Sequence, residues 1–272
     1  MNSFYGIFDL APLREKYKTS GHGVKVSILD TGIDLNNPIL KNRVLAIRDL
    51  SNPVNGTGQD TDGHGTLLAG IITSLAPSCD LLIGKIMLRS GFYTQDAFAD
   101  GVRWALRNGA EIICVASGDR FYDKETEEIV KLAASMNVIV LAAIGNNGKR
   151  SPHAGTYPAR CSESIAVGAV DDQGAITSFC EVNPTIKMIC TPGVEIDSFD
   201  LKGGIVPDSG TSQSTAYATA VLALVLSKLK SEGKPYAVSE IKESLFRSCL
   251  SRVSEEIAYS VIYPEMLFKS LF

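Results

Sequence analysis

Three short segments of the sequence each carry one residue of a type used in acyl transfer. Asp30 follows an apolar run in LDTGID, His64 lies between glycines in DGHGT, and Ser212 lies in SGTSQS at the start of an apolar stretch. A serine hydroxyl becomes a nucleophile when an imidazole takes its proton, and a buried carboxylate holds that imidazole in the productive tautomer. Singly, the three residues are more typical of a turn, a loop and a helix N-cap. Together they predict a serine nucleophile with its base and orienting acid.

The surrounding sequence alternates short apolar runs with helical patterns. Strands are expected at 24–29, 81–88, 111–116, 138–144 and 165–170, and helices at 97–106, 124–136, 212–230 and 238–246. Strands that are apolar on both faces indicate a mostly parallel central sheet with helices on both faces. We therefore expect one α/β domain over residues 1–272. Ligands of such sheets bind outside the carboxyl ends of the strands, which is where Asp30 falls.

Composition narrows the partners and the compartment. The chain has 272 residues, 45% hydrophobic and 21% charged, with a net charge of −4 and no Lys/Arg-dense stretch, so no nucleic-acid partner is expected. The longest apolar run, 216–226, is too short to cross a bilayer, so no membrane partner is expected either. The N-terminus lacks the features of a signal peptide, and the six cysteines show no C-x-x-C spacing. These features favour a cytoplasmic protein with reduced thiols. The alternative is a secreted protein that has lost its signal and prosegment.

The three segments resemble those of a known family. VSILDTGID, DGHGTLLAG and GTSQSTAYATA are similar to the Asp, His and Ser segments of the subtilisin-like serine peptidases, and the similarity extends over nearly the whole chain from Tyr5 onward. The resemblance implies a subtilisin-like fold and serine endopeptidase activity, with Asp30, His64 and Ser212 as catalytic residues. The segment IGNNG resembles the one that holds the family's oxyanion asparagine, which implies that role for Asn146, with support from Thr211.

The resemblance also implies where a substrate binds. Ala116, Ser117 and Gly118 resemble the strand that lines the S1 pocket. Gly91, Phe92 and Tyr93 resemble the opposing edge, although ordinary packing accounts equally well for Phe92 and Tyr93. A protein or peptide substrate would bind between them as an extended strand. Tyr157-Pro158 matches a family dipeptide that bends the chain near S1, where a cis bond is expected.

The sequence departs from the secreted relatives in two informative places. The segment after DGHGT runs straight through without the longer loop that holds a structural calcium in those relatives, so we expect no cofactor and no high-affinity calcium site. A weaker cation site is left open by this argument. Folding without calcium or a prosegment follows as a hypothesis. Asp60, Asp62 and Asp119 would favour basic substrate side chains, with solvated loop charges as the alternative.

The same residues also fit other protein classes in part. Asp30-Thr31-Gly32 and Asp208-Ser209-Gly210 resemble the paired segments of pepsin-like aspartic peptidases, but that fold is almost entirely β and leaves DGHGT without a role. A non-catalytic binding scaffold usually shows a broken triad, whereas all three residues are present here. The same acyl-enzyme also serves maturation of a dedicated precursor peptide, or transpeptidation when an amine excludes water. The sequence does not separate these uses from general proteolysis.

Overall fold

The apolar runs form the centre of a nine-stranded sheet. The computed structural model describes residues 8–90, 92–93, 95–148, 150–254 and 257–272, and within them the sheet order is β12-β13-β9-β8-β7-β6-β1-β3-β2. Its strands are β1 (Lys25–Asp30), β2 (Val44–Asp49), β3 (Asp80–Lys85), β6 (Ile112–Val115), β7 (Ile139–Ala143), β8 (Ile165–Val170), β9 (Met188–Pro192), β12 (Cys249–Ser254) and β13 (Ile257–Ile262). Neighbouring strands pair in parallel except β12 with β13. The expectation of a mostly parallel sheet is confirmed.

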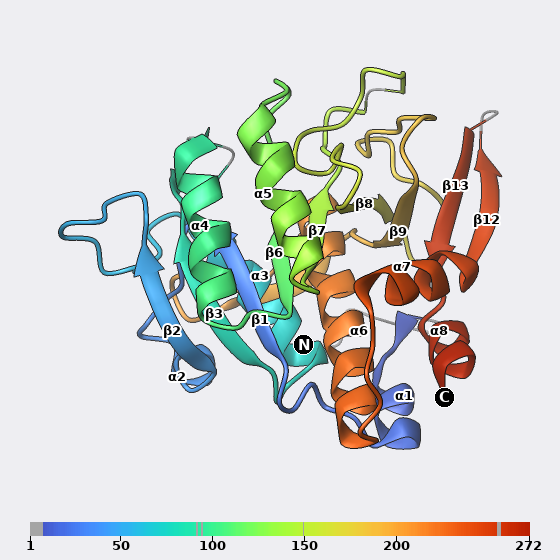
Figure 1. The fold of residues 1–272 in the computed structure, drawn as a ribbon, viewed down its shortest axis with the longest axis horizontal. Coiled ribbons are helices and arrows are strands. Elements are labelled where there is room, and N and C mark those ends of the chain that lie inside the picture. The colour runs from blue at the N-terminus through green and yellow to red at the C-terminus, as the bar shows by residue number, and fades with distance from the viewer. Residues whose placement is uncertain (1–7, 91, 94, 149, 255–256) are drawn as a thin grey trace.

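Helices cover both faces of this sheet (Figure 1). On one side α3 (His64–Leu75) packs against α6 (Thr211–Ser231), and on the other α4 (Gln95–Arg107) packs against α5 (Lys124–Ser135). The shorter helices are α1 (Ala11–Tyr17), α2 (Pro38–Lys41), α7 (Val238–Arg247) and α8 (Pro264–Leu271). The single α/β domain expected from the sequence is therefore present.

Helix α6 is the most deeply buried element that carries a predicted site residue. Its residues from Ala216 to Leu226 are apolar apart from a tyrosine and a threonine, and all are buried. The Tyr217 hydroxyl donates a hydrogen bond to the Phe8 carbonyl at 2.8 Å, and Thr219 Oγ1 donates to the Thr215 carbonyl at 2.8 Å. Burying each leucine contributes roughly 2 kcal/mol, so the apolar run anchors the helix firmly. Ser212 lies in the first turn of this anchored helix.

Several strands were not predicted, and one predicted strand is divided. The run 81–88 splits into β3, which ends at Lys85, and β4 (Met87–Arg89), which pairs with β5 (Phe92–Tyr93). A second hairpin joins β10 (Ile196–Phe199) to β11 (Ile205–Asp208), whose residues are all exposed. Edge strands and exposed hairpins lack the continuous apolar run that marks a central strand.

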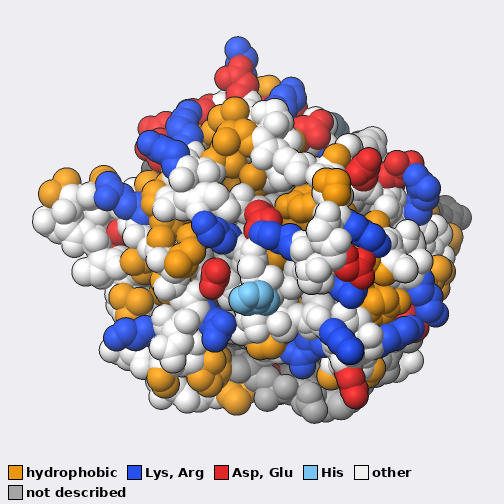
Figure 2. Space-filling view, turned by 60° about the horizontal axis from the view of Figure 1, so that its bottom comes forward, with side chains coloured by type: hydrophobic (Ala, Val, Ile, Leu, Met, Phe, Trp, Pro, Cys, Tyr) orange, Lys and Arg blue, Asp and Glu red, His pale blue; other side chains and the backbone are white. Residues whose placement is uncertain are grey.

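The surface offers no single dominant patch on the face shown in Figure 2. There, Lys and Arg side chains are interspersed with Asp and Glu, and hydrophobic side chains occur in small groups. Among the described residues, no helix has the length and apolar character needed to span a bilayer. All six cysteines are free thiols, five of them buried and Cys249 half-buried.

Candidate active site

Asp30 and His64 meet at the carboxyl end of β1. Strand β1 ends at Asp30 and helix α3 begins at His64. The imidazole Nδ1 lies 2.7 Å from Asp30 Oδ1, which also accepts the Thr31 backbone N–H at 2.8 Å. The Asp30 side chain is fully buried, and that of His64 is 14% exposed. A Cβ on Gly65 would lie 2.3 Å from the Gly32 carbonyl oxygen, so only glycine permits this approach of the two segments.

The loop before His64 is shaped by a second carboxylate. Asp60 is buried and accepts the backbone N–H groups of Asp62, Gly63 and Thr66 at 3.0, 2.9 and 3.0 Å. Because its oxygens are used inside the loop, Asp60 does not face a substrate, and that part of the acidic-subsite expectation is wrong. Asp62 is exposed.

Lys85, which was not predicted as a site residue, binds the backbone of the residue that follows Asp30. It ends β3 directly opposite Asp30 and is 3% exposed. Its ammonium donates to the carbonyl oxygens of Thr31 at 2.6 Å and Gln59 at 3.0 Å. A lysine closing the otherwise apolar run DLLIGK was the available signal.

The charges around His64 raise its pKa. Burial lowers the pKa of His64 and is the largest single influence. The charge and hydrogen bond of Asp30, with the charges of Asp62 and Asp208, outweigh it, so that the pKa lies above its ordinary value of 6.5. A base with a pKa raised towards the working pH is suited to taking and returning a proton.

Ser212 lies next to the strand segment expected to line S1. Its hydroxyl donates to the Ala116 carbonyl at 2.9 Å, and in the described part of the chain no hydrogen bond joins it to His64. Catalytic hydrogen bonds are often formed only when substrate binds, so this arrangement is compatible with a nucleophile at rest.

Asn146 is held by the start of helix α6. Its Oδ1 accepts the Thr211 backbone N–H at 2.8 Å, which leaves the Nδ2 amide hydrogens for another acceptor. Thr211 holds Asn146 through its backbone N–H, and the expected contribution of its hydroxyl to the oxyanion hole stays a prediction. Its Oγ1 atom is buried and has no hydrogen-bond partner among the described residues.

The segment predicted to form one wall of S1 lies against residues 156–157. Ala116, Ser117 and Gly118 follow β6, and a Cβ on Gly118 would lie 2.3 Å from Thr156 Oγ1. The next residue, Asp119, exchanges two backbone hydrogen bonds with Tyr157, of 3.0 and 2.6 Å.

The dipeptide after this wall and the opposing edge complete the predicted set. The Tyr157-Pro158 bond is cis, as expected. On the opposing edge, Gly91 lies outside the described residues, and of Phe92 only its place in β5 is described. Tyr93 donates its hydroxyl to the Tyr157 carbonyl at 3.3 Å and packs against Phe98, so it has a packing role.

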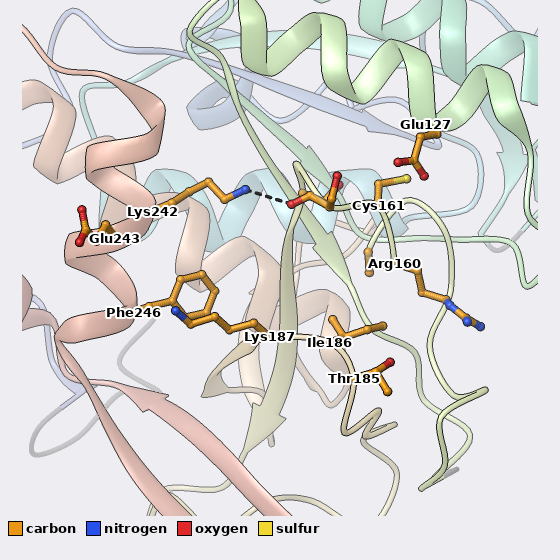
Figure 3. A pocket seen from close by; sticks show the side chains of 12 residues that line it. Glu127, Arg160, Cys161, Thr185, Ile186, Lys187, Lys242, Glu243 and Phe246 are labelled. Atoms are coloured by element: carbon orange, nitrogen blue, oxygen red, sulfur yellow. Dashed lines mark hydrogen bonds between the residues drawn. The ribbon is translucent and has the colours of Figure 1, made fainter.

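One of the cavities touches the proposed site. This cavity, of about 460 Å³, touches His64, with Leu67 among its apolar lining and the carboxylates of Asp62, Asp200 and Asp208 around it. Another, of about 540 Å³, lies between α5, the segment after Pro158 and α7 (Figure 3). There the Lys242 ammonium donates to the carbonyl oxygens of Ser162 and Glu163 at 3.2 and 3.1 Å. The second cavity contains none of the predicted site residues.

The segment after His64, where no calcium loop was expected, is a continuous helix. Helix α3 runs without interruption from His64 to Leu75, and β3 begins at Asp80. Within the described residues, no group of three or more His, Cys, Asp or Glu side chains is placed to hold a metal ion. The absence of a calcium site stays a prediction, because calcium is also bound by backbone carbonyl oxygens.

The chain is similar to known serine proteases. A family profile described as the subtilase family matches residues 21–259. The chain is 33% identical over 223 residues to an intracellular serine protease of Paenibacillus polymyxa, covering 76% of this chain and 68% of that protein. It is 34% identical over 234 residues to a thermostable alkaline protease of Halalkalibacterium halodurans, covering 83% of this chain and 62% of that protein. The match thus spans less than two thirds of the second relative.

Solved structures similar to this one include two maturation proteases. The prenylagaramide maturation protease PagA superposes with a TM-score of 0.83 at 26% identity, covering 96% of this chain and 99% of that one. The patellamide maturation protease PatA gives a TM-score of 0.79 at 27% identity, covering 92% and 97%.

Proposed function

The chain belongs to the subtilase family of serine proteases, and we propose that Ser212, His64, Asp30 and Asn146 are the residues with which it cleaves peptide bonds. The observation that carries this proposal is the buried 2.7 Å contact between His64 Nδ1 and Asp30 Oδ1 at the carboxyl end of the sheet. Asn146 and Ser212 are linked to each other through the first turn of helix α6, where Asn146 Oδ1 accepts the Thr211 N–H. An aspartic peptidase or a non-catalytic scaffold would leave some of these four residues without a role.

The proposed reaction begins with the Ser212 hydroxyl turning from the Ala116 carbonyl towards His64. His64 takes the hydroxyl proton as the oxygen attacks the substrate carbonyl, and then gives the proton to the leaving amine. Asp30 keeps Nδ1 protonated, so that the other ring nitrogen acts as the base, and its charge stabilises the imidazolium that forms. Water then attacks the acyl-enzyme carbonyl, with His64 taking a proton from the water and giving it to the Ser212 oxygen as the carboxylic acid product leaves.

The negative charge of the tetrahedral intermediate falls beside two N–H donors. Asn146 offers Nδ2, since its Oδ1 is already bound to the Thr211 amide. The Ser212 amide lies in the first turn of α6, where the helix dipole favours negative charge. Donors fixed in this way are worth more than mobile water, because they need no reorganisation during the reaction.

A peptide is the substrate class, and we propose that it binds as an extended strand along residues 116–118. The segment 155–157 lies directly beside it, held by the Asp119 and Tyr157 backbone hydrogen bonds, and residues 91–93 stay the predicted opposing edge. Backbone hydrogen bonds to the strand give affinity, while pockets beside it select side chains.

Maturation of a dedicated precursor peptide is the second candidate role. It is favoured by the similarity to PagA and PatA, which extends over more than nine tenths of each chain. Their names describe those two proteins only, and the triad alone serves hydrolysis and peptide-bond formation equally. Mass spectrometry of products from a candidate precursor separates the two outcomes, because a hydrolysed product carries one added water and a transpeptidated product does not.

A fluorophosphonate probe tests the proposed nucleophile. The wild-type protein is expected to be labelled and Ser212→Ala to be unlabelled and inactive while keeping its fold. Ser214→Ala is the matched control, because Ser214 is a buried serine on the same helix that bonds the Thr191 carbonyl at 3.0 Å. Labelling of Ser212→Ala, or unchanged turnover by it, would refute the assignment. An aspartic mechanism would leave all three proteins unlabelled.

A further inference from the structure

Glu181 is a buried carboxylate in the connection between β8 and β9, outside every motif noted in the sequence. Its side chain is fully buried. Oε1 accepts from Arg120 Nη2 at 2.5 Å and Asn147 Nδ2 at 3.1 Å, and Oε2 accepts from Arg120 Nη1 at 3.3 Å and the Gly155 N–H at 2.7 Å. Three residues thus donate four hydrogen bonds to this carboxylate.

These donors belong to the three segments that build the proposed site. Arg120 lies two residues beyond Gly118 at the end of the substrate strand. Asn147 adjoins the oxyanion residue Asn146, and Gly155 precedes Thr156 and Tyr157, which lie beside the substrate strand. One carboxylate therefore connects the substrate strand, the segment beside it and the oxyanion loop.

The oxyanion loop, residues 145–148, contacts this carboxylate directly. Gly145 has φ +119°, and a Cβ there would lie 2.8 Å from Glu181 Oε1. The Glu181 backbone N–H also donates to the Gly145 carbonyl at 3.0 Å, and the Gly148 N–H donates to the Phe179 carbonyl at 2.7 Å. Side-chain and backbone contacts thus fix the loop on the side opposite helix α6.

The charge state agrees with this geometry. Burial raises the pKa of Glu181, but the hydrogen bond from Arg120, with those from Gly155 and Asn147, outweighs it, so that the pKa lies below its ordinary value. The group is thus ionised at neutral pH, and a buried ion left without one of its partners is strongly unfavourable. The three segments are held at fixed distances from one another for this reason.

We propose that Glu181, with Arg120, is a positioning residue that holds Asn146 in place. This inference rests on the proposed role of Asn146 in the oxyanion hole. Glu181 touches no reacting atom and acts through the placement of the Asn146 amide.

The test is a double-mutant cycle on kcat with Glu181→Gln and Asn146→Ala. Because every neighbour of Glu181 is a donor, the Gln amide nitrogen faces an N–H group whichever way it is turned. A misplacement of about 1 Å costs up to about 100-fold in rate, so we expect Glu181→Gln to lower kcat about tenfold. In the Asn146→Ala background the same change is expected to lower kcat less than twofold, since the residue through which it acts is gone.

The matched control is Glu111→Gln. Glu111 also accepts only from donors, namely Lys230 Nζ at 2.9 Å, Tyr236 Oη at 3.2 Å and the Lys25 N–H at 3.2 Å. It precedes β6 at the end of the sheet opposite the site, so Glu111→Gln is expected to lower the melting temperature and leave kcat unchanged.

The outcomes are separable. Equal losses of kcat from Glu181→Gln in both backgrounds, or a fall in melting temperature with unchanged kcat, overturn the positioning role while leaving Asn146 in place. An Asn146→Ala variant that keeps wild-type kcat overturns the proposed oxyanion role itself. If Glu181→Gln does not fold, Arg120→Lys replaces it, since lysine keeps the charge and loses the two-pronged contact. The same dependence on Asn146 is then expected, and its absence counts against the proposal.

Discussion

Replacing Asn146 separates the two jobs that the structure gives to its side chain. Its Oδ1 accepts the Thr211 N–H at 2.8 Å and so helps to begin helix α6, while Nδ2 is left for the oxyanion. Asn146→Ala removes both contributions. Asn146→Asp keeps an acceptor for Thr211 and places a negative charge near the helix start, where it is stabilising, but it offers no donor to the oxyanion.

The expected magnitudes follow from these contacts. Loss of one oxyanion donor costs about 2.7–4 kcal/mol in the transition state, or about 100- to 1000-fold in kcat, with little change in KM. Loss of the acceptor for the Thr211 N–H costs about 1 kcal/mol of folding free energy. We therefore expect Asn146→Ala to be slower and slightly less stable. Asn146→Asp should be at least as slow as Asn146→Ala, and it should be as stable as the wild type.

Steady-state kinetics and thermal unfolding measure the two effects side by side. A fluorogenic peptide amide selected by profiling the wild-type enzyme supplies kcat and KM, and circular dichroism supplies the melting temperature. An Asn146→Asp variant within tenfold of wild-type kcat contradicts the reasoning. So does an Asn146→Ala variant in which KM changes and kcat does not.

Two further predictions concern the pH profile and calcium. Because the pKa of His64 is raised and only the neutral imidazole is a base, kcat/KM is expected to fall on the acid side with a midpoint above 6.5. Asp62→Asn and Asp208→Asn each remove a negative charge that raises the pKa of His64, so the acid limb should move to lower pH. The control is Asp100→Asn, an exposed carboxylate whose loss should leave the limb in place. An acid limb that stays fixed in the first two variants contradicts the assignment of His64 as the base. Since α3 continues unbroken from His64 to Leu75, activity and refolding are expected to persist in excess chelator, and a loss that added calcium reverses would show that a calcium site exists.

The central sheet and its long helices could be predicted because burial on all sides leaves an unambiguous pattern. The run VIVLAA has no polar residue, and the structure places β7 there, between β6 and β8. Strand β2 shows the opposite case. Its apolar run VLAI is only four residues long and is half-buried or exposed, and Arg48 and Asp49 close the strand. The β10–β11 hairpin contains Pro207, and its second strand is exposed throughout, which leaves only pairing geometry to define it.

The triad could be predicted because each member stands in a local frame with its own chemical logic. Asp60 and Glu181 could not be assigned in this way. Both are carboxylates in polar loops, a context that usually indicates solvated charge. Asp60 accepts N–H groups of its own loop, at Gly63 and Thr66. Glu181 accepts donors from three segments that are distant in the sequence, and that convergence is a property of the folded chain.

The placement of Asn146 shows why a complete set of motifs does not by itself define a working oxyanion hole. Its amide is set from one side by the Thr211 N–H, which belongs to the anchored helix α6. The loop that carries it is set from the other side by the Glu181 carboxylate and the Gly145 backbone. An electrostatic contribution to catalysis depends on donors that are already in place when charge develops. A chain with the same triad and IGNNG segments but without a buried acceptor beneath the loop therefore needs another means of holding the asparagine.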